Sequence, residues 1–240
     1  MKLIIFALLL SLVAAAFAAN LFLGDLAEDD AMRAERLFEE RVAGYENAAS
    51  AGNARAQLEL GLVYLDGPDG LKDPKKSFRL FKQSSQQGNA EAFFQLGRLY
   101  ELGLGTETSF SEAARAYATA IRLTGHRRAL LALGMMHFQG QGVVHSEVKA
   151  AEYFRQAAEQ GEPAAQFLMG RIYESGFGVP RDPIEAYKWY ALSGRDADAV
   201  RAFNSRFNPD QALADLAATM NKSQVDAAKN AIERWRQTRG

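Results

Sequence analysis

The hydrophobic positions between residues 164 and 194 predict two helices joined by a glycine-rich turn. In both stretches apolar side chains recur every three or four residues, the spacing that places them on one face of an α-helix. In the first stretch they are Phe167, Met169, Ile172 and Tyr173, and in the second they are Ala186, Trp189, Tyr190 and Ala191. Neither helix can bury its apolar side alone, so the pair needs neighbours that pack against it.

Turn-forming and capping residues mark the ends of these two helices. Gly176 and Gly178 follow the last apolar position of the first helix and are expected to end it. Asp182 is expected to be the N-cap of the second helix, with Pro183 at its first position and Glu185 completing a capping box.

The same pattern recurs along the chain with spacings of 36, 37 and 36 residues. Each copy contains an apolar residue followed by glycine: Leu60-Gly61, Leu96-Gly97, Leu133-Gly134 and Met169-Gly170. Each copy also contains a residue suited to an N-cap, twelve positions after that glycine: Asp73, Ser109, Ser146 and Asp182. Self-similarity at this period is typical of a helical solenoid. We therefore divide this part of the chain into four repeats, at residues 53–88, 89–125, 126–161 and 162–194.

The repeated residues carry a resemblance to a known family. The pattern A-x-x-x-L-G-x-x-Y-x-x-G-x-G-V, followed by a capped helix with an aromatic pair and a terminal A-A-x-x-G, resembles the Sel-one-like repeat, a relative of the tetratricopeptide repeat. The resemblance covers about Tyr45 to Gly194. It implies an all-α fold, a right-handed α-solenoid of helix-turn-helix repeats, in an exported bacterial member of the family. For function it implies an adaptor that binds other proteins. The third copy departs from the pattern with His137 in place of tyrosine.

Both ends of the solenoid are expected to be closed by additional helices. Residues 31–52 end like the second helix of a repeat and therefore predict an N-terminal half-repeat, with Leu37 and Val42 on its buried side. Residues 195–240 predict capping helices at about 197–203, 209–220 and 222–237. Trp235 is expected to cover the open core of the last repeat.

The first residues predict export from the cytoplasm. Lys2, an apolar run and the sequence Ala16-Phe17-Ala18 predict a secretory signal peptide over residues 1–18, and an acidic lead-in follows over residues 19–30. An uncleaved membrane anchor stays open as an alternative because Leu21-Phe22-Leu23 extends the apolar region. The chain has no cysteine, which fits the bacterial periplasm. We expect a periplasmic or secreted protein that meets the membrane only through an uncleaved signal.

Composition and motifs argue against catalysis and against nucleic-acid binding. The chain has 28 basic and 29 acidic residues and no basic block, which does not favour nucleic acid as a partner. Its three histidines, His126, His137 and His145, lack the spacing of metal ligands. We expect His137 to be packed in the core and the other two to be solvated loop residues. No catalytic residue, metal or cofactor is predicted. An accessory of a peptidoglycan- or polysaccharide-active enzyme and a membrane-anchored structural spacer stay open as alternatives.

The binding residues are sought on the first helix of each repeat, because this helix lines the concave groove in related tetratricopeptide solenoids. Repeats one and three carry apolar residues on that face, whereas repeats two and four carry an arginine and a glutamate three residues apart. The candidate residues are Leu62, Leu65, Phe94, Arg98, Glu101, Leu131, Met135, Phe138, Arg171 and Glu174. Either these apolar residues are core and the charged pairs are solvated bridges, or the face binds a partner. The expected partner is a protein or peptide of the cell envelope, bound by a monomer.

Overall fold

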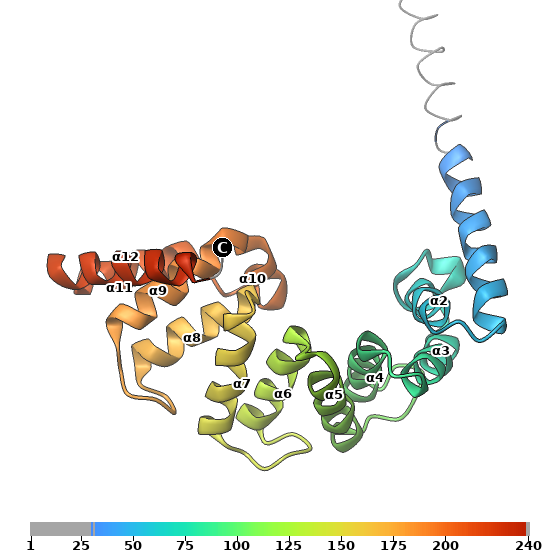
Figure 1. Ribbon diagram of the computed structural model, residues 1–240, viewed down its shortest axis with the longest axis horizontal. Helices are drawn as coiled ribbons and strands as arrows, with labels where there is room; N and C mark the ends of the chain where they lie inside the picture. The colour runs from blue at the N-terminus through green and yellow to red at the C-terminus, as the bar shows by residue number, and fades with distance from the viewer. Residues whose placement is uncertain (1–29, 31, 239–240) are drawn as a thin grey trace, which may run out of the picture.

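The computed structural model describes residue 30 and residues 32–238. Figure 1 shows their helices following one another in antiparallel pairs along an arc, with the N-terminal helix at one end of the arc and α12 (Lys222–Gln237) at the other. The predicted all-α solenoid is confirmed. The predicted signal peptide at 1–18 lies outside the described residues, and so does the acidic lead-in except for residue 30.

Each repeat consists of two α-helices that pack side by side. The four pairs are α2 (Ala54–Asp66) with α3 (Pro74–Gln86), α4 (Ala90–Leu102) with α5 (Phe110–Thr124), α6 (Arg127–Gln139) with α7 (Glu147–Glu159), and α8 (Pro163–Ser175) with α9 (Pro183–Ser193). In each of the last three pairs the first helix packs on the second helix of the pair before it, so that the repeats form a continuous stack.

The second helices begin at the residues that the sequence predicts. The side chains of Asp73, Ser109, Ser146 and Asp182 each accept a hydrogen bond from the backbone N–H three residues later. The capping box expected at Glu185 does not form, because the backbone N–H of Asp182 donates to the carbonyl oxygen of Tyr173 at 2.9 Å and the Glu185 carboxylate accepts from Lys188. A reciprocal capping box is present at Asn221 and Gln224, where the last helix begins.

A glycine in each first helix allows the two helices of a repeat to approach closely. A Cβ atom at Gly61, Gly97, Gly134 or Gly170 would lie between 2.4 and 2.6 Å from an aromatic ring of the second helix. The four rings belong to Phe81, Tyr117, Phe154 and Tyr190. Carbon atoms do not approach one another so closely, so only glycine fits at these positions.

A second set of glycines positions each loop against the preceding repeat. Gly105 and Gly142 have φ values of +71° and +68°, a region that favours glycine. A Cβ atom on Gly105 would lie 2.1 Å from the carbonyl oxygen of Pro74, at the start of α3. The first repeat has Asp69 at the corresponding position, and its loop forms the short 3₁₀ helix η1 (Asp69–Leu71) instead.

The N-terminal half-repeat is a helix over residues 32–50. Val42 is buried against the first repeat, as predicted. The prediction for Leu37 is wrong, since 54% of its surface is exposed. Figure 1 shows the reason: the N-terminal half of this helix projects beyond the first repeat and has no neighbouring helix there.

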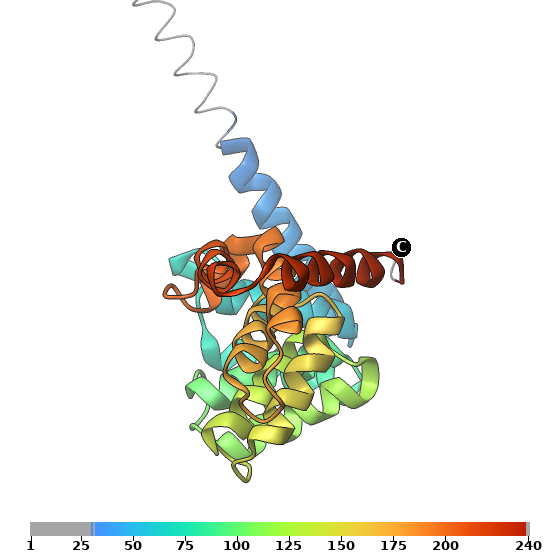
Figure 2. The same ribbon diagram turned by 90° about the vertical axis from the view of Figure 1, so that its left-hand side faces the viewer.

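Three helices follow the last repeat: α10 (Ala197–Phe203), α11 (Pro209–Thr219) and α12 (Lys222–Gln237), preceded by the 3₁₀ helix η2 (Gly194–Asp196). Helix α12 packs along α9, and Figures 1 and 2 show it at the C-terminal end of the arc. The Trp235 ring meets the buried ring of Trp189 edge-on, with centroids 6.4 Å apart. Trp235 therefore covers the last repeat, as predicted. No helix in the described part of the chain is both long and apolar enough to span a membrane.

Candidate protein-binding face

The first-helix face is the surface formed by the candidate residues of α2, α4, α6 and α8. Two of those candidates are not accessible on it, because Phe94 and Leu131 keep only 6% and 7% of their surface exposed. Phe94 packs against the ring of Tyr117 on α5, with centroids 5.8 Å apart. Both side chains belong to the hydrophobic core, as the first of the two interpretations expects, so they are not available to a partner although both are among the candidate residues.

Three other apolar candidates are half-buried between repeats. Leu62 and Leu65 of α2 pack against the core cluster that contains Leu99 of α4. Met135 of α6 packs against the cluster formed by repeats three and four. These three side chains therefore hold neighbouring repeats together and offer only part of their surface.

Exposed apolar side chains lie at the C-terminal ends of the first helices. Phe138 of α6 is 42% exposed, and its ring meets that of Phe177 edge-on, with centroids 5.5 Å apart. Leu102, at the end of α4, is 58% exposed. The first-helix face thus has apolar groups that a partner could reach, although Leu102 was not among the predicted site residues.

The two candidate glutamates accept hydrogen bonds from tyrosines of the second helices. Tyr117 donates to Glu101 at 2.7 Å, and Tyr190 donates to Glu174 at 2.6 Å. Burial, together with these carboxylates, raises the pKa of both tyrosines, so the hydroxyl groups stay protonated donors. Repeats one and three have phenylalanine instead of tyrosine and an apolar residue instead of glutamate: Phe81 with Leu65, and Phe154 with Phe138. A first helix therefore carries glutamate where the second helix has tyrosine, and an apolar residue where the second helix has phenylalanine.

The arginines three residues before these glutamates have other partners. Arg98 donates a hydrogen bond to the side-chain oxygen of Gln95 at 2.9 Å. The guanidinium group of Arg171 lies 5.8 Å from the ring centroid of Phe207. The interpretation as bridges between arginine and glutamate within one helix is therefore not supported, since among the described residues neither pair is within ion-pair distance.

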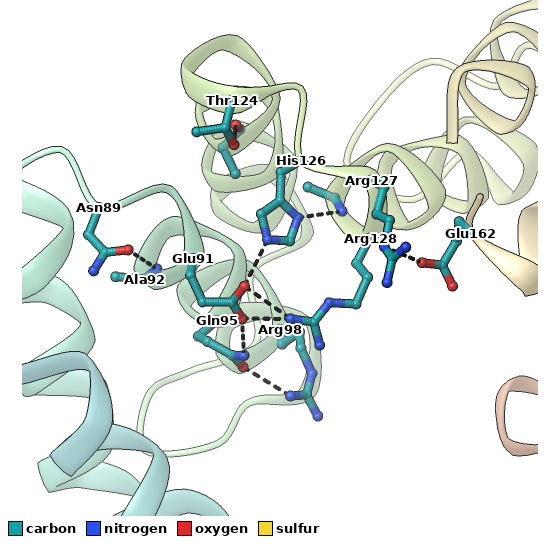
Figure 3. A network of polar contacts seen from close by, with 12 residues as sticks. Asn89, Glu91, Ala92, Gln95, Arg98, Thr124, His126, Arg127, Arg128 and Glu162 are labelled. Carbon is teal, nitrogen blue, oxygen red and sulfur yellow. Dashed lines mark hydrogen bonds and ion pairs between the residues drawn. The ribbon is translucent and has the colours of Figure 1, made fainter. Parts of the chain in front are cut away.

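A polar network around Glu91 joins the first helices of repeats two and three (Figure 3). The Glu91 carboxylate accepts hydrogen bonds from Gln95 at 2.7 Å and from Arg128 at 2.9 and 3.0 Å, and it lies 2.9 Å from Nε2 of His126. Burial by itself would raise the pKa of Glu91, but the hydrogen bond from His126 and the charge of Arg128 outweigh it and lower the pKa to about 2. Glu91 is therefore ionised at neutral pH and already has hydrogen-bond partners within the protein.

His126 belongs to this network, so the prediction that it is a solvated loop residue is wrong. Its Nδ1 accepts a hydrogen bond from the backbone N–H of Ala129 and caps α6, so Nε2 carries the proton and donates it to Glu91. The imidazole ring stacks on Phe94, with centroids 4.7 Å apart, and the Arg128 guanidinium lies 4.7 Å from the centroid of the same phenylalanine. These contacts between repeats explain why Phe94 is buried.

The other two histidines lie where the sequence predicts them, His137 buried in the core and His145 exposed. In the part of the chain that the structure describes, no group of three or more His, Cys, Asp or Glu side chains could hold a metal ion.

Arginine side chains provide free hydrogen-bond donors on the first-helix face. Arg98 makes one hydrogen bond to Gln95, and Arg127 lies 3.4 Å from the Glu162 carboxylate at the edge of Figure 3. The Arg128 side chain is half exposed. A guanidinium group has five N–H donors, so these arginines keep donors for a ligand. Among the glutamates, Glu91 has both oxygens occupied by Gln95, His126 and Arg128, whereas Glu101 and Glu174 each accept one hydrogen bond from a tyrosine. Such a face favours a ligand that brings acceptors, such as peptide carbonyl groups or carboxylates.

The C-terminal segment covers this face at the fourth repeat. Phe207, between α10 and α11, stacks on Phe167 of α8 with ring centroids 4.5 Å apart, and Arg171 lies over the ring of Phe207. The accessible part of the first-helix face therefore lies on repeats one to three. This contact could not be predicted from the sequence, because Phe207 lies in an irregular segment outside the repeats.

Comparison with known proteins identifies the repeats. The Sel1 repeat family model matches residues 54–89, 90–122, 127–162 and 163–198. The chitin synthase regulator SKT5 of Saccharomyces cerevisiae is 30% identical over 173 residues, which are 70% of this chain and 25% of that protein. The ERAD-associated E3 ubiquitin-protein ligase component HRD3B of Arabidopsis thaliana is 34% identical over 89 residues, 37% of this chain and 15% of that protein. The chain spans a quarter of the length of SKT5, and less of HRD3B.

Solved structures of other proteins share the fold. One is c5321, a protective antigen of uropathogenic Escherichia coli strains with an SLR fold, with a TM-score of 0.70 and 29% identity over 81% of this chain and 40% of that chain. Another is a Sel1 repeat protein from Oxalobacter formigenes, with a TM-score of 0.59 and 31% identity over 64% of this chain and 63% of that chain. With its four matched repeats and this fold, the chain belongs to the Sel1 repeat family, whose α-solenoid is a scaffold for protein interactions.

Proposed function

We propose that this chain is an exported, non-catalytic scaffold that binds a protein or peptide partner of the cell envelope on the first-helix face. The observation that carries the proposal is the combination of exposed apolar groups at Leu102 and Phe138 with arginine donors at Arg98 and Arg128 on the same helices. Apolar anchors beside arginine are typical of the few residues that provide most of the affinity at protein interfaces.

The chemistry of this face defines the kind of segment that would bind there. Apolar side chains of the partner would lie on Leu102 and Phe138, and its carbonyl or carboxylate oxygens would accept hydrogen bonds from Arg98 and Arg128. The Glu91 carboxylate already accepts hydrogen bonds from Gln95 and Arg128, so it offers little to a basic partner. An acidic or neutral partner segment with exposed apolar side chains fits best.

The test uses a photoreactive benzoylphenylalanine at position 138 in cells that produce the protein natively. We expect it to crosslink to a partner, which mass spectrometry then identifies. With the purified partner, Phe138→Ala and Arg98→Ala are each expected to weaken binding at least tenfold, as a loss of about 1.4 kcal/mol would do. Both variants should keep the melting temperature of the unchanged protein, because the two side chains are not buried in the core.

Val148 and Arg122 provide matched controls, because they are an exposed valine on α7 and an exposed arginine on α5, both outside the first-helix face. The photoreactive residue at 148 should not crosslink to the same partner, and Arg122→Ala should leave the affinity unchanged. If the partner binds equally well to Phe138→Ala and Arg98→Ala, it uses another surface and the first-helix face is not the binding site.

Export and cleavage form part of the proposal, supported by Lys2, the apolar run after it and Ala16-Phe17-Ala18. N-terminal sequencing of the protein from its native cells is expected to begin at Ala19. A mature chain that still begins at Met1 and sediments with membranes would contradict cleavage and support the membrane-anchored spacer. Recovery of most of the protein in the cytoplasm would contradict export altogether.

The names of the fungal relatives favour a polysaccharide-synthesising enzyme as the partner. SKT5 and chitin synthase regulatory factor 3 of Schizosaccharomyces pombe, which is 32% identical over 148 residues, are both named for the regulation of a polysaccharide-synthesising enzyme. A second candidate function is therefore an accessory of such an enzyme. The crosslinking experiment decides between this function and a scaffold for other envelope proteins, because it identifies the partner directly.

A further inference from the structure

A pocket of about 380 Å³, open to solvent, lies on the opposite side of α6 from the first-helix face, between α5 and α7. Leu133 and His137 line it, and by helical periodicity they point away from Met135 and Phe138. We call it the α5–α7 cavity, and its walls include Ala114, Ala118, Leu133, His137, Val143 and Tyr153. The proposed function on the other face does not involve it.

The repeat before it has a smaller cavity in a similar place. That cavity, of about 260 Å³, lies between α3 and α5, and Tyr100 occupies in it the repeat position that His137 occupies in the α5–α7 cavity. The α5 helix has Ala114 and Ala118 where the α3 helix has Phe78 and Lys82. Small side chains on α5 and histidine in place of tyrosine thus leave more room in the third repeat.

His137 gives this cavity a hydrogen-bond acceptor that has no partner. The side chain is only 7% exposed, and its ring stacks on Tyr153 with centroids 5.5 Å apart. Its Nδ1 lies 3.0 Å from the carbonyl oxygen of Val144. Because a carbonyl oxygen can only accept, Nδ1 carries the proton and Nε2 of the neutral ring is the acceptor. Within the described residues no protein donor reaches Nε2, so this nitrogen is an acceptor that a ligand in the pocket can reach. A ligand that covered Nε2 without donating to it would leave the acceptor unpaired, which costs free energy.

From this arrangement we infer that the α5–α7 cavity binds the indole side chain of a tryptophan from a partner protein. The alanine, leucine and valine walls favour an apolar ring, and the indole N–H can donate to Nε2 of His137. Arg115 also lines the cavity and can lie over the face of the ring, where a cation is attracted. A phenylalanine would leave Nε2 without a donor. A carboxylate would place its negative charge against the lone pair of Nε2, which repels it.

The test titrates the full chain with indole and with 1-methylindole, which has the same ring system without the N–H group. Binding is followed by the ¹H–¹⁵N NMR shifts of the backbone amides. Indole is expected to cause saturable shifts confined to residues around the cavity, such as Ala114, Ala118 and Tyr153. 1-Methylindole is expected to bind about fivefold more weakly, because it lacks one hydrogen bond of about 1 kcal/mol.

His137→Tyr provides the matched variant, because the other three repeats have tyrosine at this position: Tyr64, Tyr100 and Tyr173. It is expected to keep the melting temperature and to lose the indole shifts, whereas Phe138→Ala on the opposite face should keep them. The inference is overturned if indole and 1-methylindole bind equally well. It is also overturned if indole causes no saturable shift up to its solubility limit, or if His137→Tyr folds normally and still binds indole.

Discussion

Replacing Gly134 or Gly170 by leucine is expected to destabilise the protein by about 1–3 kcal/mol, the usual cost of adding atoms to a closely packed core. A Cβ atom at Gly134 would lie 2.6 Å from the ring of Phe154, and one at Gly170 would lie 2.5 Å from the ring of Tyr190. Both rings are almost completely buried and cannot move aside. The helices of the repeat must therefore separate to admit the new side chain, and thermal or denaturant unfolding measures the cost.

Gly44 provides the control for this prediction. It also lies within a helix, but it is exposed, and no atom lies within 4 Å of the position that its Cβ would take. Gly44→Leu should stabilise the protein slightly, because leucine favours the helix over glycine by somewhat less than about 1 kcal/mol. The same gain in helix propensity applies to Gly134→Leu. The difference in unfolding free energy between Gly134→Leu and Gly44→Leu therefore measures the steric effect. Equal melting temperatures for Gly134→Leu, Gly170→Leu and the unchanged protein would show that the paired helices separate freely.

Much of the fold could be predicted because the repeat specifies it locally. The N-caps, the glycines at the helix crossings and the ends of the helices each depend on residues close in sequence, and four copies confirm one another. The predictions failed where a side chain depends on neighbours that the repeat does not define. Leu37 has the spacing of a buried residue, but the helix around it extends beyond the first repeat.

The binding face was predicted less well, because helical spacing places a residue on a face without showing what lies opposite it. Phe94 is covered by His126 of the next repeat, a contact that spacing alone does not reveal. The role of His126 as the N-cap of α6 could have been predicted, because Asn53 and Asn89 occupy the equivalent N-cap position in the first two repeats.

The pairing of tyrosine with glutamate could also have been found in the sequence. Tyr117 and Tyr190 occur in the repeats that have Glu101 and Glu174, and the other two repeats have phenylalanine with an apolar residue. Comparison of both helices of each repeat, rather than of the first helices alone, would have shown that these glutamates have a structural role.

Removal of α12 by truncation after Met220 is expected to produce a protein that aggregates or melts at a clearly lower temperature. Helix α12 packs along α9, where Ile232 and Trp235 belong to the hydrophobic cluster that contains Trp189 and Leu192. Without α12 these apolar side chains of α9 would face water. Terminal elements with a polar outer surface are generally needed to keep repeat arrays soluble.

Two point variants separate the contribution of the buried face of α12 from that of its exposed face. Ile232→Ala is expected to cost about 2 kcal/mol or more, since Ile232 is 7% exposed and its truncation leaves a cavity against α9. Lys229→Ala, on the exposed side of the same helix, should change the stability by less than about 0.5 kcal/mol. Denaturant unfolding of the full chain measures both values. If the 1–220 protein were soluble and as stable as the full chain, α12 would not be a cap. In that case α12 would be the next surface to examine for partner contact.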